Sequence, residues 1–190
     1  MNGCNIGVIG AGLMGHGIAY LLAAAGHSVR VYDPSAQWRE SLTERLESAR
    51  ALLGGDPALL GRISSHDQMA PAMKDVAFVF EAAPEKLPLK QQLFAELESL
   101  TAPDTILASN SSAIPSTRIG EKLKHRDRVV GTHFWNPPHL VPLVEVTQNE
   151  KTSAKTIERT MTLLREAGRI PVHVKKDIWP APGFVDTRLN

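Results

Sequence analysis

Two kinds of hydrophobic pattern alternate along the chain. Short runs of apolar and β-branched residues, bounded by glycine, proline or polar residues, predict buried strands. Longer stretches in which apolar residues recur every three or four positions predict helices. The predicted strands are residues 4–9, 28–32, 76–80, 105–108, 128–131, 143–147 and 171–174. The predicted helices are residues 12–25, 35–53, 87–100 and 153–167. This alternation is typical of an α/β fold with a mostly parallel sheet and helices on both faces.

Local sequence signals predict where a helix begins and ends, and the sheet type predicts which edge binds ligands. Ser35 is expected to cap the second helix, and Gly54 and Gly55 end it. In an open sheet of this kind ligands bind at the carboxyl ends of the strands. Polar residues that directly follow a strand are therefore the first candidates for function.

The first such candidate is the glycine-rich segment 10–15 (GAGLMG), which follows a strand and opens a helix. In this context Gly-x-Gly-x-x-Gly predicts a dinucleotide site on a Rossmann-type, doubly wound sheet. Gly10 permits the tight turn, Gly12 lets the backbone approach a pyrophosphate, and Gly15 lets helix and strand pack closely. The alternatives are a glycine-rich turn without a ligand and a flavin dinucleotide.

The cofactor predicted for this loop is NAD. The loop residues Leu13 and Met14 lie at the start of the helix, whose free N–H groups can bind an anion. Asp33 ends the second predicted strand, 18 residues after Gly15. Its carboxylate can accept hydrogen bonds from ribose hydroxyls and would repel a 2′-phosphate, which favours NAD over NADP.

A second candidate is a histidine followed by a returning strand. His133 ends a predicted strand, residues 136–138 (NPP) force a turn, and Glu145 lies in the apolar strand that follows. This arrangement can bring Glu145 beside His133, where a carboxylate would fix the imidazole as a general base. A structural histidine is the alternative. His139 is a competing base, which we expect to face solvent from the turn.

Two further polar segments follow strands. Residues 109–112 (SNSS) predict a hydrogen-bonding patch that could orient a substrate oxygen, with a helix cap as the alternative. The segment 81–90 carries Glu81, Glu85 and Lys90. Taken alone, these charges are interpreted as helix capping and solvated surface charge.

Composition narrows the function classes. The chain has 190 residues, about one domain's length, with 21 Lys and Arg against 20 Asp and Glu. This balance provides no field for binding nucleic acid or an anionic membrane. The single cysteine excludes a disulfide framework and a multi-cysteine metal site, and we expect no metal. No apolar run approaches the ~20 residues of a membrane helix. We therefore expect a cytoplasmic protein with a small-molecule substrate.

Three motifs together resemble the NAD-binding domain of the 3-hydroxyacyl-CoA dehydrogenase family, over residues 5–188. They are the SNSS segment, the HFWNP of residues 133–137 and the LVEV of residues 143–146. The resemblance implies reversible oxidation of a 3-hydroxyacyl compound to the 3-oxo compound, with NAD⁺ as the hydride acceptor.

The resemblance also implies roles for single residues. His133 is the catalytic base and Glu145 its partner. Ser112 contacts the substrate, and Asn136 lies near the reacting oxygen or the nicotinamide. Contacts with NAD are implied for Asn110, Glu85 and Lys90.

Two departures from the family pattern bear on the substrate and on the domains. Residues 34–73 contain no lysine, so no positive surface for coenzyme A is evident. Residues 136–145 (NPPHLVPLVE) and 152–160 (TSAKTIERT) are similar to the lambda-crystallin branch, which includes L-gulonate 3-dehydrogenase, and to carnitine dehydrogenases, a resemblance that implies small 3-hydroxy acids without CoA. The end motif at residues 176–188 has three extra residues, and Thr187 replaces an asparagine.

We expect residues 1–176 to form the NAD-binding domain. Residues 177–190 are then a remnant of the connection to the family's helical substrate and dimerisation domain, which is absent from this sequence. A homodimer is expected only if such a helical domain is supplied.

The function predicted from these residues is an NAD-dependent dehydrogenase. A non-catalytic NAD-binding module of the crystallin kind is the alternative of a different class. A dehydrogenase of the 3-hydroxyisobutyrate type shares the Gly-Leu-Met-Gly stretch, but its lysine motif is not found here.

Overall fold

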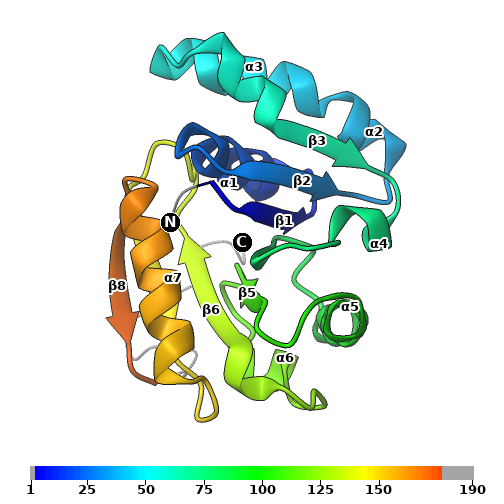
Figure 1. The fold of residues 1–190 in the computed structure, drawn as a ribbon, viewed down its shortest axis with the longest axis vertical. Helices are drawn as coiled ribbons and strands as arrows, with labels where there is room; N and C mark the ends of the chain where they lie inside the picture. Colours follow the sequence, from blue (N-terminus) through cyan, green and yellow to red (C-terminus); the bar gives the residue numbers. More distant parts are fainter. Residues whose placement is uncertain (1–2, 177–190) are drawn as a thin grey trace, which may run out of the picture.

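Eight strands of the described residues form one sheet, in the order β3-β2-β1-β4-β5-β6-β7-β8 (Figure 1). The computed structural model describes residues 3–176. The strands are β1 (Asn5–Ile9), β2 (Ser28–Tyr32), β3 (Ile63–His66), β4 (Phe78–Glu81), β5 (Ile106–Ser109), β6 (Val129–Phe134), β7 (Leu143–Thr147) and β8 (Ile170–Val174). The first six strands run parallel, β7 is antiparallel to β6, and β8 is parallel to β7.

The sheet is doubly wound. From β1 the chain builds outward through β2 to β3, then returns to place β4 on the other side of β1. This reversal creates a crevice between the loops that follow β1 and β4, where open α/β sheets bind ligands. The predicted Rossmann-type, mostly parallel sheet is confirmed.

Helices cover both faces of the sheet (Figure 1). They are α1 (Leu13–Ala24), α2 (Ala36–Glu40), α3 (Leu42–Leu53), α4 (Met69–Ala72), α5 (Leu87–Leu100), α6 (Ser116–Ile119) and α7 (Ala154–Glu166). Two 3₁₀ helices, η1 (Pro57–Arg62) and η2 (Arg126–Arg128), precede β3 and β6.

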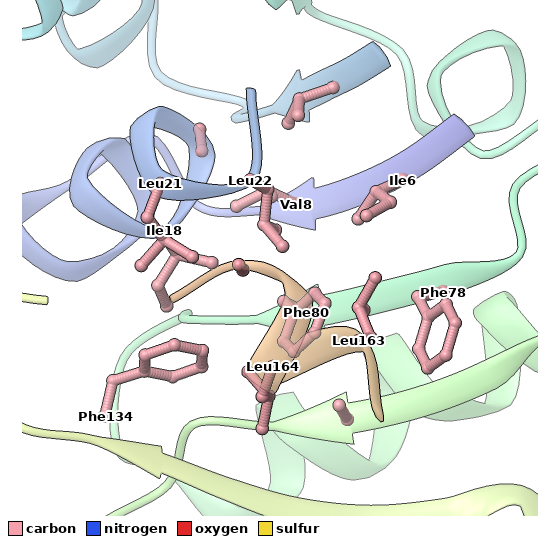
Figure 2. Close-up of a cluster of buried hydrophobic side chains, with 14 of the residues drawn as sticks. Ile6, Val8, Ile18, Leu21, Leu22, Phe78, Phe80, Phe134, Leu163 and Leu164 are labelled. Atoms are coloured by element: carbon pink, nitrogen blue, oxygen red, sulfur yellow. The ribbon is translucent and has the colours of Figure 1, made fainter. Parts of the chain in front are cut away.

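The strand side chains alternate between two cores, one on each face of the sheet. Figure 2 shows the core in which β1 and β4 meet α1 and α7, with Ile6, Val8, Phe78, Phe80, Ile18, Leu22, Leu163 and Leu164. On the opposite face Val79 and Leu107 belong to the core of Phe94 and Leu97 in α5. The same alternation turns the polar residues that end β4 and β5 toward α5.

The predicted helix over residues 35–53 is wrong as a single element. The structure divides it into α2 and α3 at Ser41, whose hydroxyl donates to the Gln37 carbonyl at 2.8 Å. Such a back-bonded hydroxyl competes with the helical ladder and bends a helix. Ser35 occupies the N-cap of α2, but its side chain makes no capping hydrogen bond.

Strand β3 was not predicted, because its sequence, ISSH, has a single apolar residue. It forms by pairing along β2 at the edge of the sheet, where a strand does not need an alternation of apolar and polar residues. Within the described residues no helix has the length and hydropathy to cross a bilayer. Residues 177–190, the expected connection to a helical domain, lie outside the described residues.

Candidate active site

The glycine-rich loop lies between the end of β1 and the start of α1, and two of its glycines are required by space. Gly10 has φ +95°, and a Cβ there would lie 2.8 Å from the Ala82 carbonyl oxygen after β4. A Cβ on Gly15 would lie 1.7 Å from the Gly10 carbonyl oxygen. Gly12 differs, since a Cβ there would meet no atom of the described chain within 4 Å. The backbone at Gly12 is therefore open to a ligand.

A pocket of about 610 Å³ borders this loop. Gly10, Gly12, Leu13 and Met14 line it, and so does Asp33, which follows β2. The rest of its wall comes from the ends of β1 and β2, from Pro34, from α2, α4 and α5, and from the segment after β4. Its volume is in the range of about 300–1,000 Å³ that small-molecule sites occupy. Helix α1 begins at this pocket without a side-chain cap, so its first N–H groups can meet an anion.

Asp33 is buried and held by the backbone on both sides. Its Oδ2 accepts from the Ala11 N–H at 2.7 Å and its Oδ1 from the Ser35 N–H at 2.9 Å. A carboxylate offers about four acceptor positions, so further positions stay available for hydroxyl donors. The structure thus fixes the orientation of the predicted ribose-binding carboxylate before any ligand arrives.

Arg45 of α3 is a neighbour of this site that the sequence did not reveal. Its guanidinium donates to the carbonyl oxygens of Ala11 and Gly12, the latter at 3.2 Å. It also lies over the Trp38 ring, 5.1 Å from the centroid, and donates to the Trp38 carbonyl. Arg45 of α3 is one of several arginines that alternate with glutamates along residues 39–50, so no local pattern distinguishes it from Arg39 or Arg50.

The predicted juxtaposition of His133 and Glu145 is confirmed. The two residues lie directly opposite each other on β6 and β7, and Nδ1 of the imidazole is 2.7 Å from Oε2 of the carboxylate. Their side chains are 18% and 33% exposed, so both reach the surface of the sheet. They line a small pocket of about 90 Å³ with Ser112 and other residues of the SNSS segment. Nε2 of His133 is the ring nitrogen left for a ligand.

The residues of the SNSS segment differ in their hydrogen-bond partners. The Ser109 hydroxyl donates to Glu81 Oε2 at 2.6 Å, and the Ser111 hydroxyl donates to Glu85 Oε1. Asn110 Oδ1 accepts from the Phe134 N–H at 2.9 Å, which ties the end of β5 to β6. Ser112 lines the small pocket, and within the part of the chain that the structure describes its hydroxyl has no such bond.

Glu81 and Lys90 are a buried ion pair, which corrects their interpretation as solvated charge. Glu81 Oε1 is 2.6 Å from Lys90 Nζ, and their side chains are 0% and 1% exposed. Glu85 is partly exposed and lies 3.4 Å from the same ammonium. Burial raises the pKa of Glu85, but hydrogen bonds from Ser111 and Ala113 and the Lys90 charge outweigh it, so the pKa lies below its ordinary value.

Two other predicted residues lie elsewhere. Asn136 is exposed in the turn after β6 and lines neither pocket. His139 does not face solvent as predicted, because its ring packs against His16 and Tyr20 of α1. Burial, with the Arg169 charge, lowers the pKa of His139. Among residues 3–176, no three His, Cys, Asp or Glu side chains gather as metal ligands.

Comparison with known proteins places the chain. Residues 5–178 match the family described as "3-hydroxyacyl-CoA dehydrogenase, NAD binding domain". A relative from Mesorhizobium japonicum, 5-formyl-3-hydroxy-2-methylpyridine 4-carboxylate 5-dehydrogenase, is 35% identical over 97% of this chain and 60% of its own length. Lambda-crystallin of Oryctolagus cuniculus is 32% identical over 96% of this chain and 59% of its own length.

A solved structure is similar to this chain in fold as well as in sequence. The 3-hydroxybutyryl-CoA dehydrogenase of Escherichia coli K12 superposes with a TM-score of 0.85 at 35% identity, over 93% of this chain and 39% of that one. The chain spans about three fifths of the length of the two curated relatives.

Proposed function

Because the chain belongs to the 3-hydroxyacyl-CoA dehydrogenase family as its NAD-binding domain, we propose that it carries the cofactor site and catalytic base of an NAD-dependent dehydrogenase. The reaction is the reversible oxidation of a 3-hydroxyacyl compound or a small 3-hydroxy acid to the 3-oxo compound. The observation that carries this proposal is the His133–Glu145 pair, 2.7 Å apart, at the carboxyl edge of the sheet that also carries the dinucleotide pocket.

The residues of the larger pocket fit NAD. Gly10, Gly12 and Gly15 shape the loop, and Leu13 and Met14 bring the first N–H groups of α1 to the pocket. Asp33 would accept hydrogen bonds from ribose hydroxyls, and Asn110, Glu85 and Lys90 are the further proposed contacts of NAD. When bound, NAD⁺ supplies the hydride acceptor.

His133 is the proposed general base. Its Nδ1 is held by Glu145, so Nε2 is free to take the proton of the substrate hydroxyl. In the reverse direction the imidazolium returns that proton to the forming alkoxide, and Glu145 stabilises its charge. Ser112 is the proposed donor to the reacting oxygen, because its hydroxyl lines the pocket beside His133. Asn136, in the turn after β6, is the proposed contact of the reacting oxygen or of the nicotinamide.

A small 3-hydroxy acid is favoured over a substrate linked to coenzyme A. Residues 34–73 contain no lysine. Arg39 donates to the Asp33 carbonyl at 2.8 Å, and Arg45 donates to the glycine-rich loop. Both guanidinium groups are therefore engaged with the protein rather than presented to a CoA phosphate.

We expect NADH to bind at least about tenfold more tightly than NADPH, because the Asp33 carboxylate that lines the pocket repels an added phosphate. Asp33→Asn should narrow this preference by weakening the repulsion. Quenching of tryptophan fluorescence can report binding, since Trp38 lines the pocket. Asp67→Asn, at an exposed aspartate, is the matched control. Tighter binding of NADPH by the unaltered chain would overturn the role given to Asp33.

The proposed function is tested by assaying the purified chain with NAD⁺ and three substrates: 3-hydroxybutyryl-CoA, L-gulonate and L-carnitine. Turnover with L-gulonate or L-carnitine supports a small 3-hydroxy acid, and turnover with the thioester alone supports a CoA-linked substrate. NADH binding without any turnover supports the second candidate, a non-catalytic NAD-binding module. The likeness to lambda-crystallin favours testing for it.

A further inference from the structure

Opposite charges hold the backbone of Ala11, between the first two glycines of the glycine-rich loop. The Ala11 N–H donates to Asp33 Oδ2 at 2.7 Å, and its carbonyl oxygen accepts a hydrogen bond from the guanidinium of Arg45. The same guanidinium nitrogen, Nη1, also donates to the Gly12 carbonyl oxygen at 3.2 Å. Because glycine leaves the backbone free on both sides of Ala11, these bonds are needed to fix the conformation of the loop.

The two carbonyl bonds set the direction of the N–H groups that the loop presents. The peptide bonds that follow Ala11 and Gly12 are trans, and in a trans peptide the C=O and the N–H point in opposite directions. Since both carbonyl oxygens face Arg45, the N–H groups of Gly12 and Leu13 point away from it. Both residues line the dinucleotide pocket, and neither N–H has a hydrogen-bond partner within residues 3–176. The arrangement therefore leaves two donors for an anion in the pocket.

Arg45 also connects the loop to a second wall of the same pocket. Its guanidinium lies over the Trp38 ring, 5.1 Å from the centroid, and its Nη2 donates to the Trp38 carbonyl oxygen at 2.8 Å. Trp38 belongs to α2 and lines the pocket. One side chain of α3 thus fixes the spacing between the glycine-rich loop and α2.

The position of Arg45 is unfavourable for the fold by itself. Its Nε is buried and has no hydrogen-bond partner within the part of the chain that the structure describes. Burial lowers the pKa of Arg45, and the charge of Asp33 offsets this only in part. Unpaired buried donors are rare, and such departures concentrate at functional sites. These features favour a role in ligand binding over a role in stability alone.

We propose that Arg45 is a positioning residue for the cofactor, which acts through the carbonyl groups of Ala11 and Gly12 to hold the glycine-rich loop in the conformation that binds the NAD diphosphate. Its charge, on the side of the loop away from the pocket, adds a longer-range attraction for this anionic group. The effect on NADH affinity rests on the proposed function, whereas the effect on the loop of the ligand-free chain does not.

The test uses the whole chain and three single substitutions. Arg45→Met removes the donors and the charge but keeps an unbranched stem against Trp38. Arg45→Lys keeps the charge and a donor but lacks the planar fork that serves two carbonyl groups and an aromatic ring together. Arg50→Met is the matched control, because it removes the same charge from the same helix, where Arg50 donates to Glu47 and to the Gly55 carbonyl.

We expect Arg45→Met to weaken NADH binding about tenfold in calorimetric titration, as loss of charge-assisted hydrogen bonds implies. Arg45→Lys should bind NADH within about threefold of the unaltered chain, since the charge remains. Adenosine, which lacks the diphosphate, should compete with NADH at an affinity that Arg45→Met changes by less than about twofold. The melting temperature of Arg45→Met should be close to that of the Arg50→Met control.

Hydrogen exchange measures the loop without any ligand. The His16 amide donates to the Gly12 carbonyl at 3.1 Å as the first bond of α1. Because Arg45 holds the same carbonyl, exchange of this amide should be about fivefold faster in Arg45→Met than in the unaltered chain. Amides of β5 should exchange at unchanged rates.

Two binding results would overturn the proposal. One is an NADH affinity of Arg45→Met equal to that of the Arg50→Met control. The other is a loss of adenosine affinity as large as the loss for NADH, which would place the effect at Trp38 or in general packing. If the unaltered chain binds no NADH, the proposed function fails, but exchange of the His16 amide still decides whether Arg45 holds the loop, and an unchanged rate would overturn that role.

Discussion

Replacing His133 with alanine should lower kcat by about a thousandfold, within the range that removal of a general base produces. NADH affinity should stay within about twofold, since His133 lies in the smaller pocket and the dinucleotide pocket has other walls. Steady-state assays with the substrate found active, together with fluorescence titration of NADH, measure the two quantities separately.

Substitution of Glu145 is expected to lower kcat by a smaller factor than substitution of His133. Glu145→Gln retains a side chain that can contact His133 Nδ1 but cannot stabilise an imidazolium by charge, so it should reduce kcat less than His133→Ala. His125→Ala, at an exposed histidine, is the matched control and should leave turnover unchanged. Turnover above about a tenth of the original in His133→Ala would exclude His133 as the base.

The second large effect is expected in the glycine-rich loop, where substitutions of Gly12 and Gly15 should change different quantities. Gly12→Ala should weaken NADH binding at least about tenfold while the unfolding midpoint stays unchanged, because its Cβ meets no protein atom within 4 Å and projects into open space at the pocket. Gly15→Ala should destabilise the fold by about 3 kcal/mol or more, because its Cβ would lie 1.7 Å from the Gly10 carbonyl oxygen.

Urea unfolding and NADH titration of both variants distinguish a ligand contact from a packing contact. Gly61→Ala is the control, since its Cβ also meets nothing within 4 Å and lies far from the loop in sequence. Unchanged NADH binding by Gly12→Ala would contradict the placement of the pyrophosphate at this loop. Unchanged stability of Gly15→Ala would contradict the close approach of α1 to the loop.

The sheet and its cofactor loop could be predicted because their signals are local. Residues 10–15 combine a strand end, a required positive φ at Gly10 and a helix start within one short segment. The return of the chain after the proline turn was predictable for the same reason, whereas the register that sets His133 opposite Glu145 follows from the pairing of β6 with β7 across the connection of residues 135–142. The kink at Ser41 was missed, because a serine within an otherwise helical pattern has no unique local outcome.

By itself, the sequence determined the α/β alternation, the glycine-rich loop with Asp33, and the histidine and glutamate of one strand pair. Only the tertiary structure decided which charges are buried and what they hold. Lys90 meets Glu81 across 9 residues, Glu81 accepts from Ser109 across 28 residues, and Arg45 reaches back 33 residues to Gly12 of the glycine-rich loop. The physical reason is that burial and ion pairing depend on which elements pack together, and no residue pattern within one element encodes its neighbour.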